Sequence, residues 1–149
     1  MADDKRISPY LFAVEIDGIQ TARFQKCEGL EAETSVYEIE EGGLMTATHK
    51  FAGRTRYPNL ILEKGVTEND DLFAWYRQAA LEDKAVERKN GAVILKDAGN
   101  NEIKRWNFFR AFPCRWVGPR LEANTGTEFA LERIEITHEG IVVDAAEKT

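Results

Sequence analysis

The side chains best suited to chemistry in this sequence are two histidines and two cysteines. His49, His138, Cys27 and Cys114 are far apart along the chain. Neither histidine lies in a metal-binding spacing such as H-E-x-x-H, and neither cysteine lies in a C-x-x-C unit. A cysteine nucleophile beside a histidine would have to be assembled by the fold, because no local motif supports one.

These four side chains fit structural roles better than chemical ones. His138 continues the alternation of Ile134 and Ile136, so we expect a histidine of the core or its rim. Thiols of cytosolic proteins are usually reduced. We therefore expect both cysteines to be reduced and buried, without a disulfide and without a metal site.

Carboxylates gather in two places, one at Glu38, Glu40 and Glu41 and the other at Asp70 and Asp71. A carboxylate hydrolase needs a positioned pair of acids in a cleft. The first group is typical of a solvated strand end and loop, and the second is typical of the start of a helix. We predict no enzyme activity, no catalytic residue, no cofactor and no metal.

Aromatic residues could line a ligand pocket, although such residues form cores more often. The candidates are Trp75, Tyr76, Trp106, Phe108, Phe109, Phe112 and Trp116. We expect them to be core, and a small-ligand-binding β-barrel remains an alternative that apolar dyes would test.

Length and charge exclude several classes of function. The chain has 149 residues, 43% of them hydrophobic, and a formal net charge of −6. This is the size of one domain, and a nucleic-acid binder normally carries a basic excess. The sequence contains no phosphate-binding or nucleophile-elbow motif. Without a membrane-spanning run or a signal-peptide pattern, synthesis in the cytoplasm and no membrane insertion are expected.

The elements that must position these residues are mostly strands. Alternating apolar residues and turn signals predict eight or nine short strands. Their predicted ranges are 10–17, 19–28, 31–40, 48–52, 59–65, 92–96, 102–112 continued by 115–117, 129–137 and 141–143. Capping residues at 67–71 and helical spacing from Leu72 to Ala80 predict the single helix. Without βαβ alternation, the pattern indicates an antiparallel β-sandwich or barrel with one flanking α-helix.

Three local irregularities qualify this pattern. Gly53 and Pro58 predict a break between two strands, and Pro113 predicts an interruption of another. The apolar phase shifts between Leu131 and Ile134, which predicts a β-bulge or a strand whose two ends are buried on different faces.

A loop between two predicted strands carries large apolar residues, Leu44 and Met45. The loop consists of Glu41, Gly42, Gly43, Leu44, Met45, Thr46, Ala47 and Thr48. Apolar side chains of this size need something to pack against, in the same chain or in another. Whether this hairpin completes its own domain or docks onto a neighbour decides the function.

The order of several short motifs resembles the bacteriophage tail-tube protein family, including the inner-tube subunits of phage-tail-like contractile injection systems. The motifs are Pro9–Gly18, Cys27–Glu31, Tyr37–Gly43, Gly53–Val66, Leu72–Trp75, Arg105–Phe108, Ala111–Pro113, Gly118–Pro119, Leu131–Glu132 and Ile134–Gly140. Each motif is weak alone, and their order and spacing together make the resemblance specific. It covers residues 9–143. Residues 1–8 are charged, and we expect a flexible segment there and a flexible tail at 144–149.

The resemblance implies a β-sandwich subunit that forms hexameric rings, which stack into a hollow tube inside a contractile sheath. The loop from Glu41 to Thr48 would then reach a neighbouring subunit. Strands of all subunits would line the channel, where the candidate lumen-facing residues are Glu15 and Asp17, or Lys104 and Glu132.

The implied partners are copies of this chain, a sheath protein, baseplate or tube-initiator proteins, and a luminal cargo or tape-measure protein. The particle would be a phage tail or a phage-tail-like injection system. A type VI secretion-like tube protein and a tube-initiator paralogue at the baseplate are the alternatives within this fold class.

Overall fold

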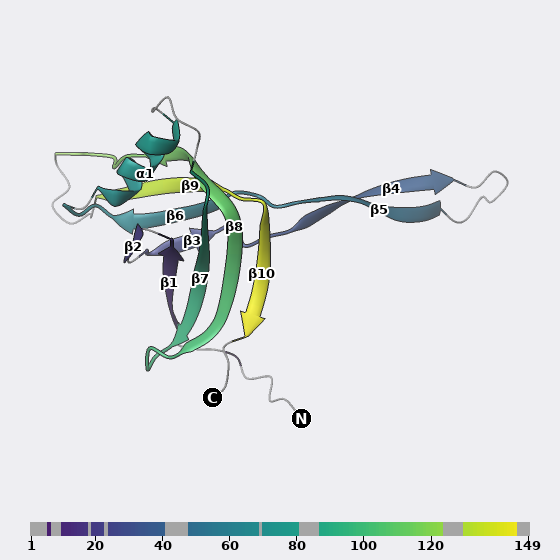
Figure 1. Cartoon of the computed structure of the whole chain (residues 1–149), viewed down its shortest axis with the longest axis horizontal. Helices are drawn as coiled ribbons and strands as arrows, with labels where there is room; N and C mark the ends of the chain where they lie inside the picture. Colours follow the sequence, from purple (N-terminus) through teal and green to yellow (C-terminus); the bar gives the residue numbers. More distant parts are fainter. Residues whose placement is uncertain are drawn as a thin grey trace.

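The chain folds mainly as antiparallel β-sheet with one α-helix, as the sequence predicts (Figure 1). The computed structural model describes residues 6, 10–17, 19–22, 24–40, 48–68, 70–80, 87–123 and 130–145. The elements are β1 (Tyr10–Ile16), β2 (Ile19–Ala22), β3 (Lys26–Glu28), β4 (Glu33–Glu40), β5 (Thr48–Arg56), β6 (Leu60–Gly65), α1 (Asp71–Ala80), β7 (Lys89–Asp97), β8 (Glu102–Val117), β9 (Leu131–Thr137) and β10 (Gly140–Ala145).

Two sheets that share β8 form the body of the protein. Strands β2, β1, β7, the first half of β8 and β10 make one sheet, and the second half of β8 continues into β9, β6 and β3. In Figure 1, β7, β8 and β10 run across the direction of β6 and β9, as in an orthogonal sandwich. The core lies where the two sheets face each other. Its buried members include Val14, Leu60, Leu62, Phe108, Ile134 and Ile136.

Strand β8 passes from one sheet to the other through a bend at Arg110. This residue has a φ of 52°, a left-handed conformation that is uncommon for a residue other than glycine. The Asn90 side chain holds it there, because its Oδ1 accepts the Arg110 N–H at 3.0 Å. The predicted interruption at Pro113 is wrong, since Pro113 is buried within a continuous strand opposite Ile136. A register shift between Pro113 and Arg115 accommodates the proline.

The helix α1 packs against β8 through its predicted apolar face. Leu72 and Trp75 are buried, and the Phe73 ring lies 4.8 Å from that of Trp116. Asp71 occupies the first turn, where a negative charge suits the helix dipole. No helix within the described ranges is long and apolar enough to cross a membrane.

The end of β9 corrects one sequence-based expectation. Its pairing with β6 runs without a register shift, so the predicted bulge or change of face is wrong. The side chain of Glu132 is buried on the same face of β9 as those of Ile134 and Ile136. Glu132 is 9% exposed, and its Oε1 lies 3.2 Å from the Nζ of buried Lys64. Two opposite charges at inward positions hid the true phase of both strands.

Two other predicted strands have different bounds. The single strand expected at 19–28 is two short strands, β2 and β3, which belong to different sheets. The expected break at Gly53 is wrong, because β5 continues to Arg56. Gly53 is needed there for space, since an added Cβ would lie 2.4 Å from the Ser35 hydroxyl oxygen. The final strand reaches Ala145, two residues beyond the expected domain end.

The aromatic and cysteine predictions hold only in part. Trp75 and Phe108 are buried in the core, whereas Phe109 is 38% exposed. Both cysteines are free, as expected. Cys27 is half-buried, but Cys114 is exposed, which contradicts the expectation that both are buried.

Candidate assembly surfaces

A two-stranded arm made of β4 and β5 projects away from the body (Figure 1). Every residue of β4 and of β5 is exposed, so no part of this arm packs into the core. An isolated two-stranded hairpin is marginally stable in water, and three or more strands or a covering element are normally needed. The arm therefore has the properties of an element that is completed by something outside this chain.

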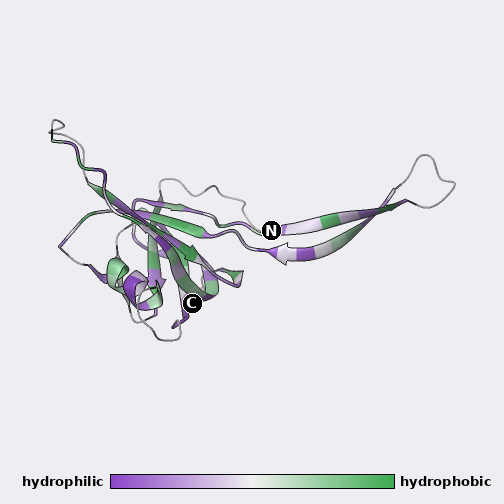
Figure 2. Ribbon diagram, turned by 90° about the horizontal axis from the view of Figure 1, so that it is seen from above, coloured by the Kyte–Doolittle hydropathy of each residue, from purple (hydrophilic) through white to green (hydrophobic). Residues whose placement is uncertain are grey.

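The arm has two chemically different faces. Tyr37 lies opposite Phe51, with the rings stacked at 5.6 Å, and Ile39 shares their face. These three side chains are between 44% and 53% exposed. Glu38 and Lys50 lie opposite each other on the other face. Figure 2 shows the resulting mixture of hydrophobic and hydrophilic residues along the arm. These exposed aromatic and aliphatic side chains give one face of the arm an apolar surface.

The described residues on either side of positions 41–47 are Glu40 and Thr48, which pair with each other at one end of the β4–β5 arm. Residues 41–47 of the loop lie outside the described residues, as do the apolar Leu44 and Met45. Thr48, the last residue of the predicted loop, starts β5 opposite Glu40. The structure therefore places Glu40 and Thr48, but not the masked residues between them, at the end of the arm that lies away from the body's sheets.

The arm joins the body at a compact group of residues that we call the arm root: Gly29, Tyr57, Pro58, Asn59 and His138. Asn59 Nδ2 donates a hydrogen bond to Glu135 Oε1 at 3.2 Å, which ties the end of the arm to β9. Gly29 has a φ of 99°, and an added Cβ would lie 2.1 Å from the Asn59 carbonyl oxygen. The Tyr57 ring lies 5.8 Å from that of His138.

Substitution of Gly29 by alanine is expected to strain the arm root. A left-handed conformation disfavours any L-residue by about 1–2 kcal/mol, and here the Cβ would also collide with backbone. The free energy of unfolding should fall by at least that amount in urea titrations. Gly65→Ala is the matched control, because its Cβ would meet nothing nearer than Gln25 Nε2 at 3.8 Å. Equal stability of the two variants would contradict the strain at Gly29.

The sheet of β1, β7, β8 and β10 carries a polar network on the face turned away from the core. Arg105 Nη2 lies 2.6 Å from Glu102 Oε1, and Arg105 Nη1 lies 3.4 Å from Glu15 Oε2. Arg105 and Glu15 are on strands separated by β7, so this pair spans β7. It thereby helps to cover Ala92 and Ile94, which are buried on the same face.

Asn107 and Asp144 extend this network toward the sheet edge, with Asn107 Nδ2 donating to Asp144 Oδ2 at 2.6 Å. The register places both residues on the same face as Glu15. A shallow hollow of about 140 Å³ on this face is lined by residues that include Glu15 and Asp17. The face is therefore polar and mainly acidic, with Arg105 paired to Glu15 and Glu102 and Asp144 bound by Asn107.

The four expected lumen-facing residues do not lie together. Glu15 and Asp17 are exposed and share the polar face. Lys104 is exposed but lies on the opposite face, opposite Leu95, with its Nζ 5.8 Å from the centre of the Trp106 ring. Glu132 is buried beneath the second sheet's surface in its pair with Lys64. A buried side chain cannot line a channel, because assembly removes exposure and does not add it.

The same sheet has two incompletely paired edges. Among the described residues, β10 pairs only with β8, and β2 pairs only with the second half of β1. The exposed side chains Tyr10 and Leu11 mark the uncovered half of β1, and Val142 and Val143 mark β10. Uncovered strand edges offer backbone N–H and C=O groups to another chain.

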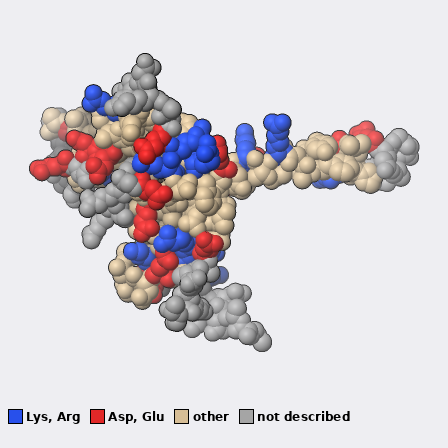
Figure 3. All heavy atoms as spheres, viewed as in Figure 1, with Lys and Arg blue, Asp and Glu red and all other residues tan. Residues whose placement is uncertain are grey.

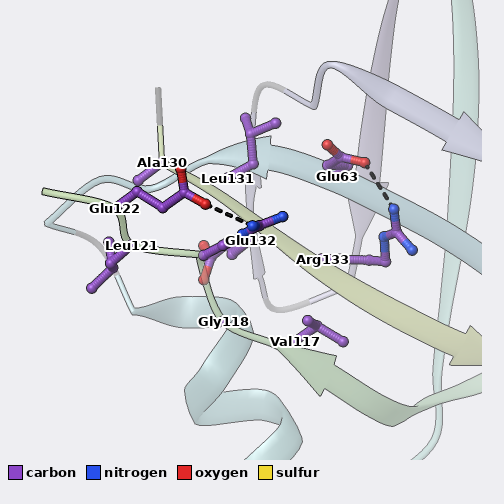
Figure 4. Close-up of a pocket in the computed structure, with 10 residues that line it drawn as sticks. Glu63, Val117, Gly118, Leu121, Glu122, Ala130, Leu131, Glu132 and Arg133 are labelled. Carbon is purple, nitrogen blue, oxygen red and sulfur yellow. Dashed lines mark hydrogen bonds and ion pairs between the residues drawn. The ribbon is translucent and has the colours of Figure 1, made fainter. Parts of the chain in front are cut away.

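A separate open hollow of about 670 Å³ lies beside the ends of β6, β8 and β9 (Figure 4). Leu121 and Leu131 contribute apolar surface to it, and ion pairs join Arg133 to Glu63 and Arg120 to Glu122 at its rim. None of the seven candidate pocket aromatics is among its described lining residues. The described lining of this hollow therefore contains no aromatic cluster.

The side chains suited to catalysis are not assembled into a centre. Burial raises the pKa of the Cys27 thiol to about 11, which keeps it protonated and weakly nucleophilic at neutral pH. Cys114 contacts Asn59 and the Glu135 carbonyl oxygen. Across the described part of the chain, no group of three or more His, Cys, Asp or Glu residues could hold a metal ion. On the face shown in Figure 3, acidic and basic side chains alternate over the body.

Comparison with known proteins gives this arrangement a context. Among curated protein sequences no match is found. Among solved structures, the tube-terminating cap of the anti-feeding prophage superimposes with a TM-score of 0.84 at 24% identity, covering 98% of this chain and 95% of that one. The sheath/tube terminator of the PVC extracellular contractile injection system gives 0.83 at 25% identity, covering 97% and 100%.

A chain of the PVC sheath–tube complex gives a TM-score of 0.83 at 23% identity, covering 96% of this chain and 94% of that one. The family model described as "T4-like virus tail tube protein gp19" matches residues 8–142. The match spans both sheets, the helix and the arm. This chain therefore belongs to the T4-like virus tail tube protein gp19 family, as the order of its sequence motifs predicts.

Proposed function

We propose that this chain is a non-enzymatic structural subunit that forms hexameric rings, which stack into the inner tube of a contractile, phage-tail-like injection system. The observation that carries the proposal is the arm, a strand pair that is exposed at every residue, has an apolar face and pairs with no other strand among the described elements. Membership of the tail tube family and the fold shared with tubes of contractile injection systems support it.

Ring formation follows from the edges of the first sheet. The antiparallel pairings of β1, β7, β8 and β10 make β10 antiparallel to β1. In a ring of equivalent subunits, β10 of one copy would lie beside the uncovered half of β1 in the next. Repeating this head-to-tail contact closes the sheets into a barrel and removes both free edges.

The polar face would then be the channel wall, because the other face of the sheet is occupied by the core. Glu15 and Asp17 would face the lumen, joined by Glu102, Arg105, Asn107 and Asp144. Lys104 and Glu132 would not face the lumen. Because the one arginine of this wall is paired with Glu15 and Glu102, the wall would be mainly acidic and would repel DNA and other acidic macromolecules.

The partners of this tube would be a sheath protein, baseplate or tube-initiator proteins, and a cargo or tape-measure protein in the lumen. The sheath is supported by the fold shared with the tube of the PVC sheath–tube complex. Such a tube would be made in the bacterial cytoplasm and would function in the assembled particle.

Removal of the apolar face of the arm is expected to weaken assembly. In Tyr37→Ser/Phe51→Ser, two side chains that would be buried against a neighbouring copy become small and polar. Burial of one such side chain contributes about 1.5–3 kcal/mol, so the concentration required for tube formation should rise about a hundredfold or more. Electron microscopy of tubes formed on co-expression with sheath and baseplate proteins measures this.

The matched control is Glu38→Ser/Lys50→Ser, an adjacent cross-strand pair on the other face of the same arm. It removes two exposed side chains of similar size and should leave tube formation close to that of the wild type. Normal tubes from the Tyr37/Phe51 variant would contradict arm docking. Absence of tubes from the wild type in the presence of sheath and baseplate proteins would contradict the proposed function itself.

A further inference from the structure

The arm root contains a buried histidine, His138, which is 7% exposed. Neither Nδ1 nor Nε2 makes a hydrogen bond of good geometry to a described residue, although the carbonyl groups of Pro58 and Gly140 favour the charged form of the ring. Its ring lies 5.8 Å from the Tyr57 ring and 6.2 Å from the Phe108 ring. A neutral imidazole is tolerated between two aromatic rings, whereas a charged one without a counter-ion is strongly disfavoured in such surroundings.

Tyr57, the residue that follows the arm, contacts His138 through its ring. It directly follows the last residue of β5, and its ring lies 3.9 Å from the position that a Cβ of Gly140 would occupy. Two residues later, Asn59 is fixed to Glu135 by a side-chain hydrogen bond. The arm is therefore held to the body by a polar tie at Asn59 and by an aromatic contact at Tyr57.

We propose that the arm root is a proton-sensitive joint, in which protonation of His138 at mildly acidic pH loosens the seat of Tyr57 and allows the arm to move relative to the body. This property belongs to the single chain and does not rest on tube assembly. It would make the orientation of the docking arm responsive to pH before a subunit joins a tube.

The described side chains that contact the His138 ring carry no negative charge that would offset its protonation. The connection between β5 and β6 contributes the phenol of Tyr57, which is neutral at acidic pH, and β8 contributes the apolar Phe108. The neighbouring carboxylate, Glu139, is already bound by Arg88 at 3.2 Å and Arg110 at 2.8 Å.

Burial lowers the pKa of His138 from its ordinary value of 6.5, partly opposed by the carbonyl groups of Pro58 and Gly140. Above pH 6.5 the histidine is neutral in both the seated and the loosened root, so pH has no effect. Below pH 6.5 the loosened root binds a proton more readily than the seated one. The seat of Tyr57 is therefore expected to weaken as the pH falls from 6.5 toward the lowered pKa.

Nuclear magnetic resonance of the isolated chain between pH 7.5 and 4.5 tests the joint. The chain has only two histidines, so His49 on the arm provides an internal reference. The His138 ring resonances should titrate with a midpoint below 6.5, and the Tyr57 ring should shift with the same midpoint. After correction for intrinsic exchange, opening at residues 57–60 should rise by up to about tenfold per pH unit. Residual dipolar couplings of β4 and β5 amides should change in parallel.

Two variants separate the joint from a general effect of acid. His138→Phe keeps a ring between Tyr57 and Phe108 but cannot bind a proton, so the pH dependence at residues 57–60 should vanish. The variant His49→Gln should retain the pH dependence at residues 57–60. A His138 midpoint at or above 6.5 in the wild type would overturn the proposal, even if His138→Phe fails to fold. So would an arm whose couplings and root exchange do not change while His138 titrates.

Discussion

Of two single proline substitutions at neighbouring positions in β10, one is expected to abolish ring formation without unfolding the subunit. The positions are Val142 and Val143, which are 50% and 51% exposed on the strand that pairs only with β8 among the described elements. Successive N–H groups of a strand point toward opposite edges. One of the two N–H groups therefore faces β8, and the other faces the free edge.

The proline that removes the outward N–H should leave the pairing with β8 intact, because proline is tolerated on edge strands when its missing donor faces solvent. In an assembled ring it would remove a hydrogen bond between subunits and place its ring against the neighbouring strand. Each junction would lose about 1–3 kcal/mol, and a closed ring suffers the loss at every junction. Tube formation should be undetectable by electron microscopy at concentrations where the wild type assembles.

The variant with proline at the other of these two positions serves as the internal control. Its missing N–H is one that bonds β8, so this variant should show a lower thermal unfolding midpoint. Circular dichroism and thermal unfolding identify which variant retains the fold of the wild type. If the well-folded variant still forms tubes, β10 is not a junction between subunits, although the arm could still be a docking element.

A single substitution that removes either charge of the buried Lys64–Glu132 pair, which joins β6 to β9, is expected to lower the free energy of unfolding more than any other single substitution. Lys64 Nζ lies 3.2 Å from Glu132 Oε1, with side chains 6% and 10% exposed. Trp116 Nε1 donates to Glu132 Oε2 at 3.3 Å. Glu132→Gln leaves the Lys64 ammonium buried without a counter-charge, which should lower the free energy of unfolding by about 3–5 kcal/mol.

The double variant Lys64→Met/Glu132→Gln should recover most of this loss. It removes both charges and keeps an amide oxygen that can accept the Trp116 N–H. Urea unfolding of the wild type, both single variants and the double variant gives the interaction free energy of the pair through a double-mutant cycle. Additive losses would show that the two charges do not stabilise each other, contrary to what their distance indicates.

The buried pair also shows why part of the sequence pattern was misleading. Strand prediction relies on apolar residues to mark the inward face, and here Lys64 and Glu132 occupy inward positions. The pattern therefore indicated a bulge near Leu131, although the pairing of β6 with β9 is regular. Two mutually neutralising charges from strands distant in the sequence cannot be recognised until the strands are paired.

The arm shows a different limit. The sequence predicts strands on both sides of the Gly-Gly loop, and β4 and β5 confirm them. Val36 and Ile39 are large apolar residues of β4, and both are at least half exposed. Alternation along a strand indicates that one face will be covered, and it does not indicate whether the cover comes from the same chain or from another.

The sequence by itself determined the mainly β class, the single helix with Leu72 and Trp75 inward, and membership of the tail tube family. Each depends on local periodicity or on short motifs in a fixed order, which a linear chain carries in full. Only the tertiary structure decided that Glu15 and Asp17 share a face of the sheet that excludes Lys104. It also decided that the His138 ring contacts the Tyr57 ring at the arm root. Those relations depend on strand register and on contacts between residues far apart in the chain, which are fixed when the sheets pack.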